Sequence, residues 1–196
     1  AASHVSCTSP PAIGVPSIGH PGSSPSMAAR RLMQEMRRLA KIAGGCRKAH
    51  AFDAAPVDDA CLLEWEVRLF YESDSLLGAG LHKRQLDHLL LRMVFTEAYP
   101  MSPPLVYVVR PKLKKHTGFV MNGGAVCMEL LTPEGWSPAT TIEALVMSVR
   151  AMLEAGRAEL ATTSMRAREA DYTRSGAERD NQHILAVHHQ HSWPPD

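Results

Sequence analysis

The chain has 196 residues, of which 45% are hydrophobic and 21% charged, and its 21 Lys and Arg residues nearly balance 20 Asp and Glu residues. This length has room for one domain and some tail. The near-zero charge argues against nucleic acid or an anionic membrane as the main partner, since no excess of cations is present to neutralise phosphates. No apolar run approaches the ~18 residues of a membrane span, and the N-terminus lacks the pattern of a secretory signal.

Residues 1–26 have a different composition from the rest, with seven Ser, five Pro and three Gly and no Lys or Arg. Such a segment buries too little apolar surface to offset its ordering entropy, so we expect a disordered tail. Residues 27–196 are expected to form the folded domain. The four cysteines of the chain lie far apart without CxxC spacing, which is typical of a cytosolic or nuclear protein; they are Cys7, Cys46, Cys61 and Cys127.

The pattern after the tail predicts a helix from Met27, ended by Gly44 and Gly45. Basic side chains surround its apolar face, and a charge run of this kind is usually a solvated surface. The apolar face consists of Leu32, Met36, Leu39, Ala40 and Ala43.

Strands follow. Apolar and polar residues alternate over 63–71, which is the period of a strand with one face on a core. Two further strands are predicted at 89–95 and 105–109, and the polar, glycine-containing stretch 72–85 is expected to connect the first two.

A second helix is predicted from a capping box, Thr140 followed three residues later by Glu143, to Gly156. Its apolar stripe should pack on the sheet. A last helix is expected over 178–189, before the sequence WPP. A helix, a run of strands and then helices is an α+β arrangement.

Cys127 is the cysteine with the most suggestive setting. A lone cysteine among apolar residues is more often packing than a nucleophile. The turn sequence NGG at 122–124, however, places this thiol near the edge of a loop. An accessible thiol suits thioester exchange. Both interpretations stay open from the residues alone.

Three separated motifs resemble the ubiquitin-conjugating enzyme family: YPMSPP at 99–104, GGAVCMELL at 123–131 and GWSPA at 135–139. NGGAVCMELLTPEGWS and the terminal VHHQHSWPP most resemble the Q-type class. The resemblance implies the α+β ubiquitin-conjugating (UBC) fold: an N-terminal helix, an antiparallel four-stranded meander, then helices packed on the sheet. It also implies a transferase that carries ubiquitin as a thioester on Cys127, with no metal and no organic cofactor. Q-type members often carry a further N-terminal domain, so this chain is expected to be a short member or a part of a longer one.

The family's His-Pro-Asn motif is absent. Its Asn would stand eight residues before Cys127, where this chain has Phe119. The Q-type class has Tyr there, so Phe119 keeps the ring and loses the hydroxyl. His116 is out of register and is expected to be a loop residue.

Other predicted site residues follow from the resemblance. His188, with Trp193 five residues later, matches a Q-type pair expected near the cysteine, where a histidine is a natural proton acceptor. The alternative is a polar helix end, where His favours the helix dipole. Glu129 falls where the family often has Asp, and either orients an incoming lysine or lies at a solvated edge. His188, His189 and His191 lack matching ligands, so we predict no metal site.

The family's activating enzyme and its ligases, of RING or HECT type, bind overlapping surfaces on the first helix and two loops. The resemblance assigns this surface to Arg30, Arg31, Arg38, Met101, Pro138 and Ala139. Ubiquitin would lie along the helix at 140–153, and protein substrates would supply a lysine or hydroxyl.

A second hypothesis is a non-catalytic relative, an inactive UBC-like or RWD-like binding module. The missing His-Pro-Asn motif favours it, and Cys127 followed by WSPA opposes it. A cysteine protease is disfavoured because no convincing Cys/His ordering or oxyanion motif is present.

Overall fold

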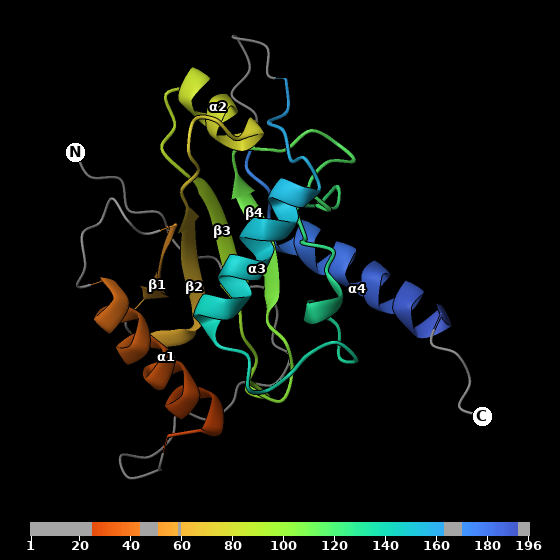
Figure 1. The fold of residues 1–196 in the computed structure, drawn as a ribbon. Coiled ribbons are helices and arrows are strands. Elements are labelled where there is room, and N and C mark those ends of the chain that lie inside the picture. The colour runs from red at the N-terminus through yellow and green to blue at the C-terminus, as the bar shows by residue number, and fades with distance from the viewer. Residues whose placement is uncertain (1–24, 44–50, 59, 163–169, 192–196) are drawn as a thin grey trace, which may run out of the picture.

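The computed structural model describes residues 25–43, 51–58, 60–162 and 170–191 (Figure 1). Most of the predicted tail, together with Cys7, Cys46 and Trp193, therefore lies outside the described residues. In chain order the elements are α1 (Met27–Ala43), β1 (Phe52–Asp58), β2 (Cys61–Leu69), α2 (Leu76–Lys83), β3 (Leu89–Val94), β4 (Leu105–Arg110), a 3-10 helix (Glu129–Leu131), α3 (Ile142–Ala155) and α4 (Arg174–His191).

The four strands form one antiparallel sheet in the order β1-β2-β3-β4, which is a meander. The α+β architecture is confirmed. None of the helices in the described part of the chain is long and apolar enough to cross a bilayer.

The sheet carries a hydrophobic core on each face, because successive strand residues point to opposite sides. On β4, Val106 and Val108 join the main core, whereas Tyr107 and its neighbours Leu105 and Val109 join a second, smaller core. The main core also receives α3, through residues such as Leu145, and the second receives α4, through Ala177 and Ile184. The two helices thus cover opposite faces of the sheet beside β4.

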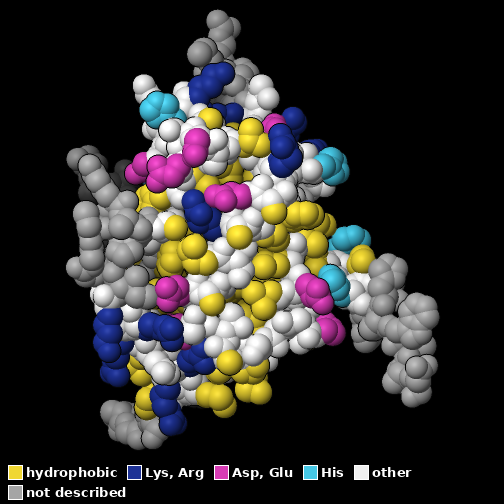
Figure 2. Space-filling view, in the orientation of Figure 1, with side chains coloured by type: hydrophobic (Ala, Val, Ile, Leu, Met, Phe, Trp, Pro, Cys, Tyr) yellow, Lys and Arg dark blue, Asp and Glu magenta, His cyan; other side chains and the backbone are white. Residues whose placement is uncertain are grey.

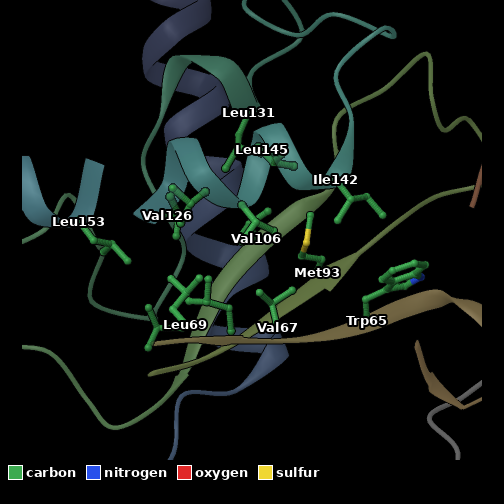
Figure 3. Packing of buried hydrophobic residues seen from close by; sticks show 14 of the residues in the cluster. Trp65, Val67, Leu69, Met93, Val106, Val126, Leu131, Ile142, Leu145 and Leu153 are labelled. Carbon is green, nitrogen blue, oxygen red and sulfur yellow. The ribbon is translucent and has the colours of Figure 1, made fainter. Parts of the chain in front are cut away.

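The main core holds the alternating residues that the sequence predicted for β2. Trp65, Val67 and Leu69 are buried on the face of the sheet that α3 covers, with Ile142, Leu145 and Leu153 of α3 in the same core (Figure 3). Burying one such side chain stabilises the fold by about 1.5–3 kcal/mol. The expectation that the second predicted helix packs on the sheet is confirmed.

Helix α1 has the predicted start, but its buried face differs from the prediction. Leu32 and Leu39 are buried, whereas Ala40 is exposed. Glu35 is 3% exposed and occupies the core side of the helix. The sequence pattern missed Glu35 because one of its two partners, the Ile142 N–H, lies 107 residues away along the chain; the other is Arg31 on the same helix.

The predicted capping box at Thr140 is wrong by one residue. The N-cap is Thr141, whose hydroxyl accepts a hydrogen bond from the Ala144 N–H at 3.1 Å. Thr140 lies outside the helix, and its carbonyl accepts a hydrogen bond from Arg31 instead. Glu143 remains in the first turn, where a carboxylate favours the helix dipole.

Three elements depart from the predicted pattern. Strand β1 was missed because FDAAPVD is rich in Ala and Asp and contains Pro56, which is tolerated at a sheet edge. The stretch 72–85, expected as a simple connection, contains helix α2, capped by Ser75. Helix α4 begins at Arg174, four residues before its predicted start.

Candidate active site

The YPMSPP and GWSPA segments lie together and are joined by a buried hydrogen bond. The indole N–H of Trp136 donates to the Pro100 carbonyl at 2.7 Å. Tyr99 packs edge-on against Phe95, with ring centroids 4.7 Å apart, and approaches Trp136 at 6.3 Å. These motif aromatics therefore fix two loops against each other. The loops' exposed residues then form one surface.

Cys127 follows a tight loop whose two sides are hydrogen-bonded to each other. The Met121 N–H donates to the Ala125 carbonyl at 2.9 Å, and the Cys127 N–H donates to the Phe119 carbonyl at 2.8 Å. Val126 forms a bridge with Val120 and enters the main core. Alternation then places Cys127 on the opposite side, packed against the second core beneath α4.

The Cys127 thiol is half-buried, and burial raises its pKa above the ordinary value. The other described cysteine, Cys61, is exposed at the start of β2. A raised pKa lowers the thiolate fraction at neutral pH.

Phe119 contacts the cysteine segment through its backbone carbonyl, which accepts the Cys127 N–H. It has a left-handed backbone with φ 55°, which is unusual for an aromatic residue. Its ring is 58% exposed and packs over Gly156, where a β-carbon would come within 2.7 Å of the ring. Gly118, immediately before, donates its N–H to the Gly156 carbonyl at 2.8 Å. The C-terminal end of α3 thus holds the residue that accepts the Cys127 N–H.

The remaining predicted catalytic residues do not belong to the cysteine loop itself. Glu129 is exposed at the start of the 3-10 helix, two residues after Cys127. His188 is half-buried on α4 and lies four residues after Ile184, hence on the helix face that carries the second core. Trp193 lies outside the described residues, as do the side chains of His189 and His191.

One contact to the cysteine loop comes from a residue that the sequence pattern missed. Asp180, on α4, accepts hydrogen bonds from backbone N–H groups at 123 and 125. The NGG turn signalled the loop, but nothing in the sequence signalled its partner 57 residues away along the chain.

The predicted partner surface separates into buried and exposed residues. Arg31 is 19% exposed and bonds to Glu35, to the Pro138 carbonyl and to the Thr140 carbonyl, each at 2.8–2.9 Å. It therefore joins α1 to the loop before α3. Arg30 is exposed, and its guanidinium bonds to Pro25.

Arg38, Met101 and Ala139 are more accessible than Arg31. Arg38 is 57% exposed and lies 3.7 Å from Glu143, and Met101 is 63% exposed. Pro138 is half-buried and Ala139 exposed. Basic side chains gather over α1, next to hydrophobic ones at the lower end of the molecule (Figure 2).

Comparison with known proteins gives a consistent family. The ubiquitin-conjugating enzyme family model matches residues 31–183. Ubiquitin-conjugating enzyme E2 Q-like protein CG4502 of Drosophila melanogaster is 35% identical over 165 residues, which cover 84% of this chain and 52% of that protein. Human ubiquitin-conjugating enzyme E2 Q-like protein 1 is 32% identical over 166 residues, covering 83% of this chain and 98% of that protein.

Longer relatives and a solved structure agree. Human ubiquitin-conjugating enzyme E2 Q1 is 34% identical, over 86% of this chain and 40% of its own length. The chain thus spans about half or less of two of these relatives and nearly all of the third. The structure of human ubiquitin-conjugating enzyme E2 G1 matches with a TM-score of 0.50 and 26% identity, covering 63% of this chain and 94% of that one. The chain belongs to the ubiquitin-conjugating enzyme family and, within it, most resembles the Q type.

Proposed function

We propose that the chain accepts ubiquitin from an activating enzyme as a thioester on Cys127 and transfers it to a substrate lysine or hydroxyl. The observation that carries this proposal is the setting of Cys127. It is the only half-buried cysteine among the described residues. It lies at the end of a hydrogen-bonded loop that, in space, contacts both α3 and α4. Phe119, whose carbonyl accepts the Cys127 N–H, has a left-handed backbone, a conformation that clusters at functional sites.

The chemistry has two balanced steps. In the first, the Cys127 sulfur attacks the ubiquitin carbonyl held as a thioester on the activating enzyme. A new S–C bond forms, the old S–C bond breaks, and the Cys127 proton ends on the departing thiol. In the second, an acceptor amine or hydroxyl attacks the same carbonyl, and Cys127 leaves as a thiolate while the acceptor loses a proton. Carboxyl activation occurs on the other enzyme, so neither step requires a metal or organic cofactor bound here.

His188 is our candidate base for the second step. It lies on the face of α4 that carries Ile184, and Ile184 and Cys127 belong to the same hydrophobic core. A histidine accepts a proton near neutral pH, as an attacking amine requires. Trp193, five residues further, would help to orient the acceptor. Glu129, exposed beside the cysteine, would contact an incoming lysine.

The proposed partner surface has fewer exposed side chains than the sequence predicted. Arg30 and Arg38 on α1 offer exposed cations, and Met101 offers an exposed apolar side chain on the loop that is hydrogen-bonded to the GWSPA segment. A small apolar patch beside cations suits transient binding to an activating enzyme or to a RING or HECT ligase. Arg31 contributes by holding the Pro138 loop. The reactive thiol fits a reducing compartment, the cytosol or the nucleus.

The proposal is tested by a charging assay with activating enzyme, ATP and ubiquitin on a non-reducing gel. We expect a thiol-sensitive band heavier by one ubiquitin in the unmodified chain and in Cys61→Ala. Cys127→Ala should lack it. Cys61→Ala is the matched control because it removes an exposed thiol. Loss of His188 should slow discharge and leave loading intact. If no band forms with several activating enzymes, the chain is a binding module.

A further inference from the structure

The carboxylate of Asp180 is bound to the backbone of the cysteine loop. One oxygen, Oδ2, accepts hydrogen bonds from the N–H of Gly123 at 2.6 Å and from the N–H of Ala125 at 3.3 Å. Hydrogen bonds to a carboxylate are shorter and stronger than those between neutral groups. Ala125 is buried, so its N–H would be costly to leave unpaired.

The fit between α4 and this loop is close enough to require glycine. A β-carbon at Gly123 would collide with the backbone carbonyl of Gly176 and come within 2.7 Å of the Asp180 carboxylate. Ala177, next to Gly176, is fully buried in the second core. The loop and the first turns of α4 are therefore in backbone contact, and Asp180 lies at that contact.

The contact is linked to the thiol through a short chain of bonds. Ala125, whose N–H Asp180 binds, closes the loop by accepting the Met121 N–H at 2.9 Å. Cys127 follows two residues later and packs on the same core as Ile184 of α4. A movement of the loop away from α4 thus moves Cys127 and disturbs the core, shared with α4, on which Cys127 packs.

We propose that Asp180 is a positioning residue, which holds the cysteine loop on α4 and thereby fixes the place and exposure of the Cys127 thiol. The consequence for ubiquitin transfer rests on the proposed function; the consequence for the thiol itself does not. Asp180 acts by accepting two N–H hydrogen bonds, so an acceptor at the same place should replace it. Its removal should make Cys127 more accessible and, at the same time, less effective in transfer.

The test compares Asp180→Ala, Asp180→Asn and Glu178→Ala in the full chain. Asn keeps an oxygen that accepts both N–H groups. Glu178→Ala is the matched control, since it removes a carboxylate of the same helix whose partner, Arg174, is 53% exposed. Two readouts are measured: single-turnover transfer of ubiquitin from charged chain to an amine, and the alkylation rate of Cys127 by iodoacetamide, resolved by peptide mass spectrometry.

We expect Asp180→Ala to slow transfer by about tenfold or more, because small displacements of a reacting group are costly. Alkylation of Cys127 should rise by about threefold or more as the thiol is uncovered, with Cys61 unchanged. Asp180→Asn should stay within about threefold of the unmodified chain in both readouts. Glu178→Ala should match the unmodified chain. A defect in Asp180→Ala that Asp180→Asn restores would show that the hydrogen-bond acceptor at this position is the cause.

Two results would overturn the proposal: unchanged alkylation and transfer in Asp180→Ala, or equal defects in Asp180→Ala and Asp180→Asn. If Asp180→Ala melts below the assay temperature, Asp180→Glu replaces it, since it moves the acceptor by one methylene. We expect an intermediate effect from that variant, and none would again overturn the proposal. If the unmodified chain takes no ubiquitin, the proposed function fails, and the alkylation rates alone still decide the role of Asp180.

Discussion

Helices α1 and α4 each use one carboxylate to hold the backbone of a distant loop, but in different environments. On α1, Glu35 is 3% exposed; it accepts the N–H of Ile142, at the start of α3, and pairs with Arg31. On α4, Asp180 is half-buried and accepts two N–H groups of the cysteine loop. The same kind of contact thus holds the start of α3 at one end and the cysteine loop at the other.

The difference between the two contacts is the amount of charge that is buried. Glu35 is buried against Arg31, and removing one partner of such a pair leaves an uncompensated charge. The Asp180 carboxylate is only half-buried, so less charge is buried at this contact. We infer that the α1 contact mainly determines stability, whereas the α4 contact mainly determines the position of the loop. The following predictions test that division.

The largest effect is expected from Glu35→Ala. The change leaves the Arg31 guanidinium without its carboxylate and the Ile142 N–H without an acceptor, so we expect a loss of about 3 kcal/mol in the free energy of unfolding. Urea denaturation measures it. Gln34→Ala, at the exposed neighbouring position, should change stability by less than about 0.5 kcal/mol. A loss under about 1 kcal/mol at Glu35 would contradict the division.

Arg31→Lys tests the same α1 contact, and its expected effect on stability is smaller. One guanidinium reaches Glu35, the Pro138 carbonyl and the Thr140 carbonyl, and a single ammonium lacks this planar fork. We expect a loss of about 1–2 kcal/mol in stability. Arg30→Lys, at an exposed site, should leave denaturation unchanged. Equal stability of the two variants would show that Arg31 acts only as a surface residue.

Gly123→Ala tests the contact between α4 and the cysteine loop by adding a methyl group to the loop. The new methyl group would meet the Gly176 carbonyl, so α4 and the loop must separate, and we expect a stability loss of about 1–2 kcal/mol. Asn122→Ala, at the exposed adjacent position, is the control. Thermal melting checks both. The result that would contradict the close contact is a Gly123→Ala chain as stable as the control.

The two contacts also show what sequence patterns reveal. Alternation identified Trp65, Val67 and Leu69 as core residues, because a strand's period is a property of the local chain. The carboxylates Glu35 and Asp180 were missed. Glu35 pairs with Arg31 on its own helix, but its backbone partner lies 107 residues away, and the two N–H partners of Asp180 lie 57 and 55 residues away along the chain. A backbone group leaves no residue type to recognise.

Only part of the candidate site was predicted, because several of its contacts are also made to backbone groups. The motif around Cys127 predicted a loop at that thiol, and the structure has it. Arg31 was expected on the partner surface because the family resemblance assigned it there; its partial burial depends on bonds to loop carbonyls that no sequence pattern reports. Helix α2 was missed because a short, glycine-containing helix carries a weak periodic signal.

The smallest effect is expected from pH and concerns the thiol. Burial raises the pKa of Cys127, so the folded chain keeps the proton where the unfolded chain begins to lose it. The stability from this difference is fully present below the ordinary thiol pKa and declines as pH rises through it. We expect the unfolding free energy of the unmodified chain, relative to Cys127→Ala, to fall by under about 1 kcal/mol between pH 8 and 10. Urea denaturation across that range measures it. A relative rise with pH would mean that the folded chain favours the thiolate, and that burial is not the dominant effect on the Cys127 sulfur.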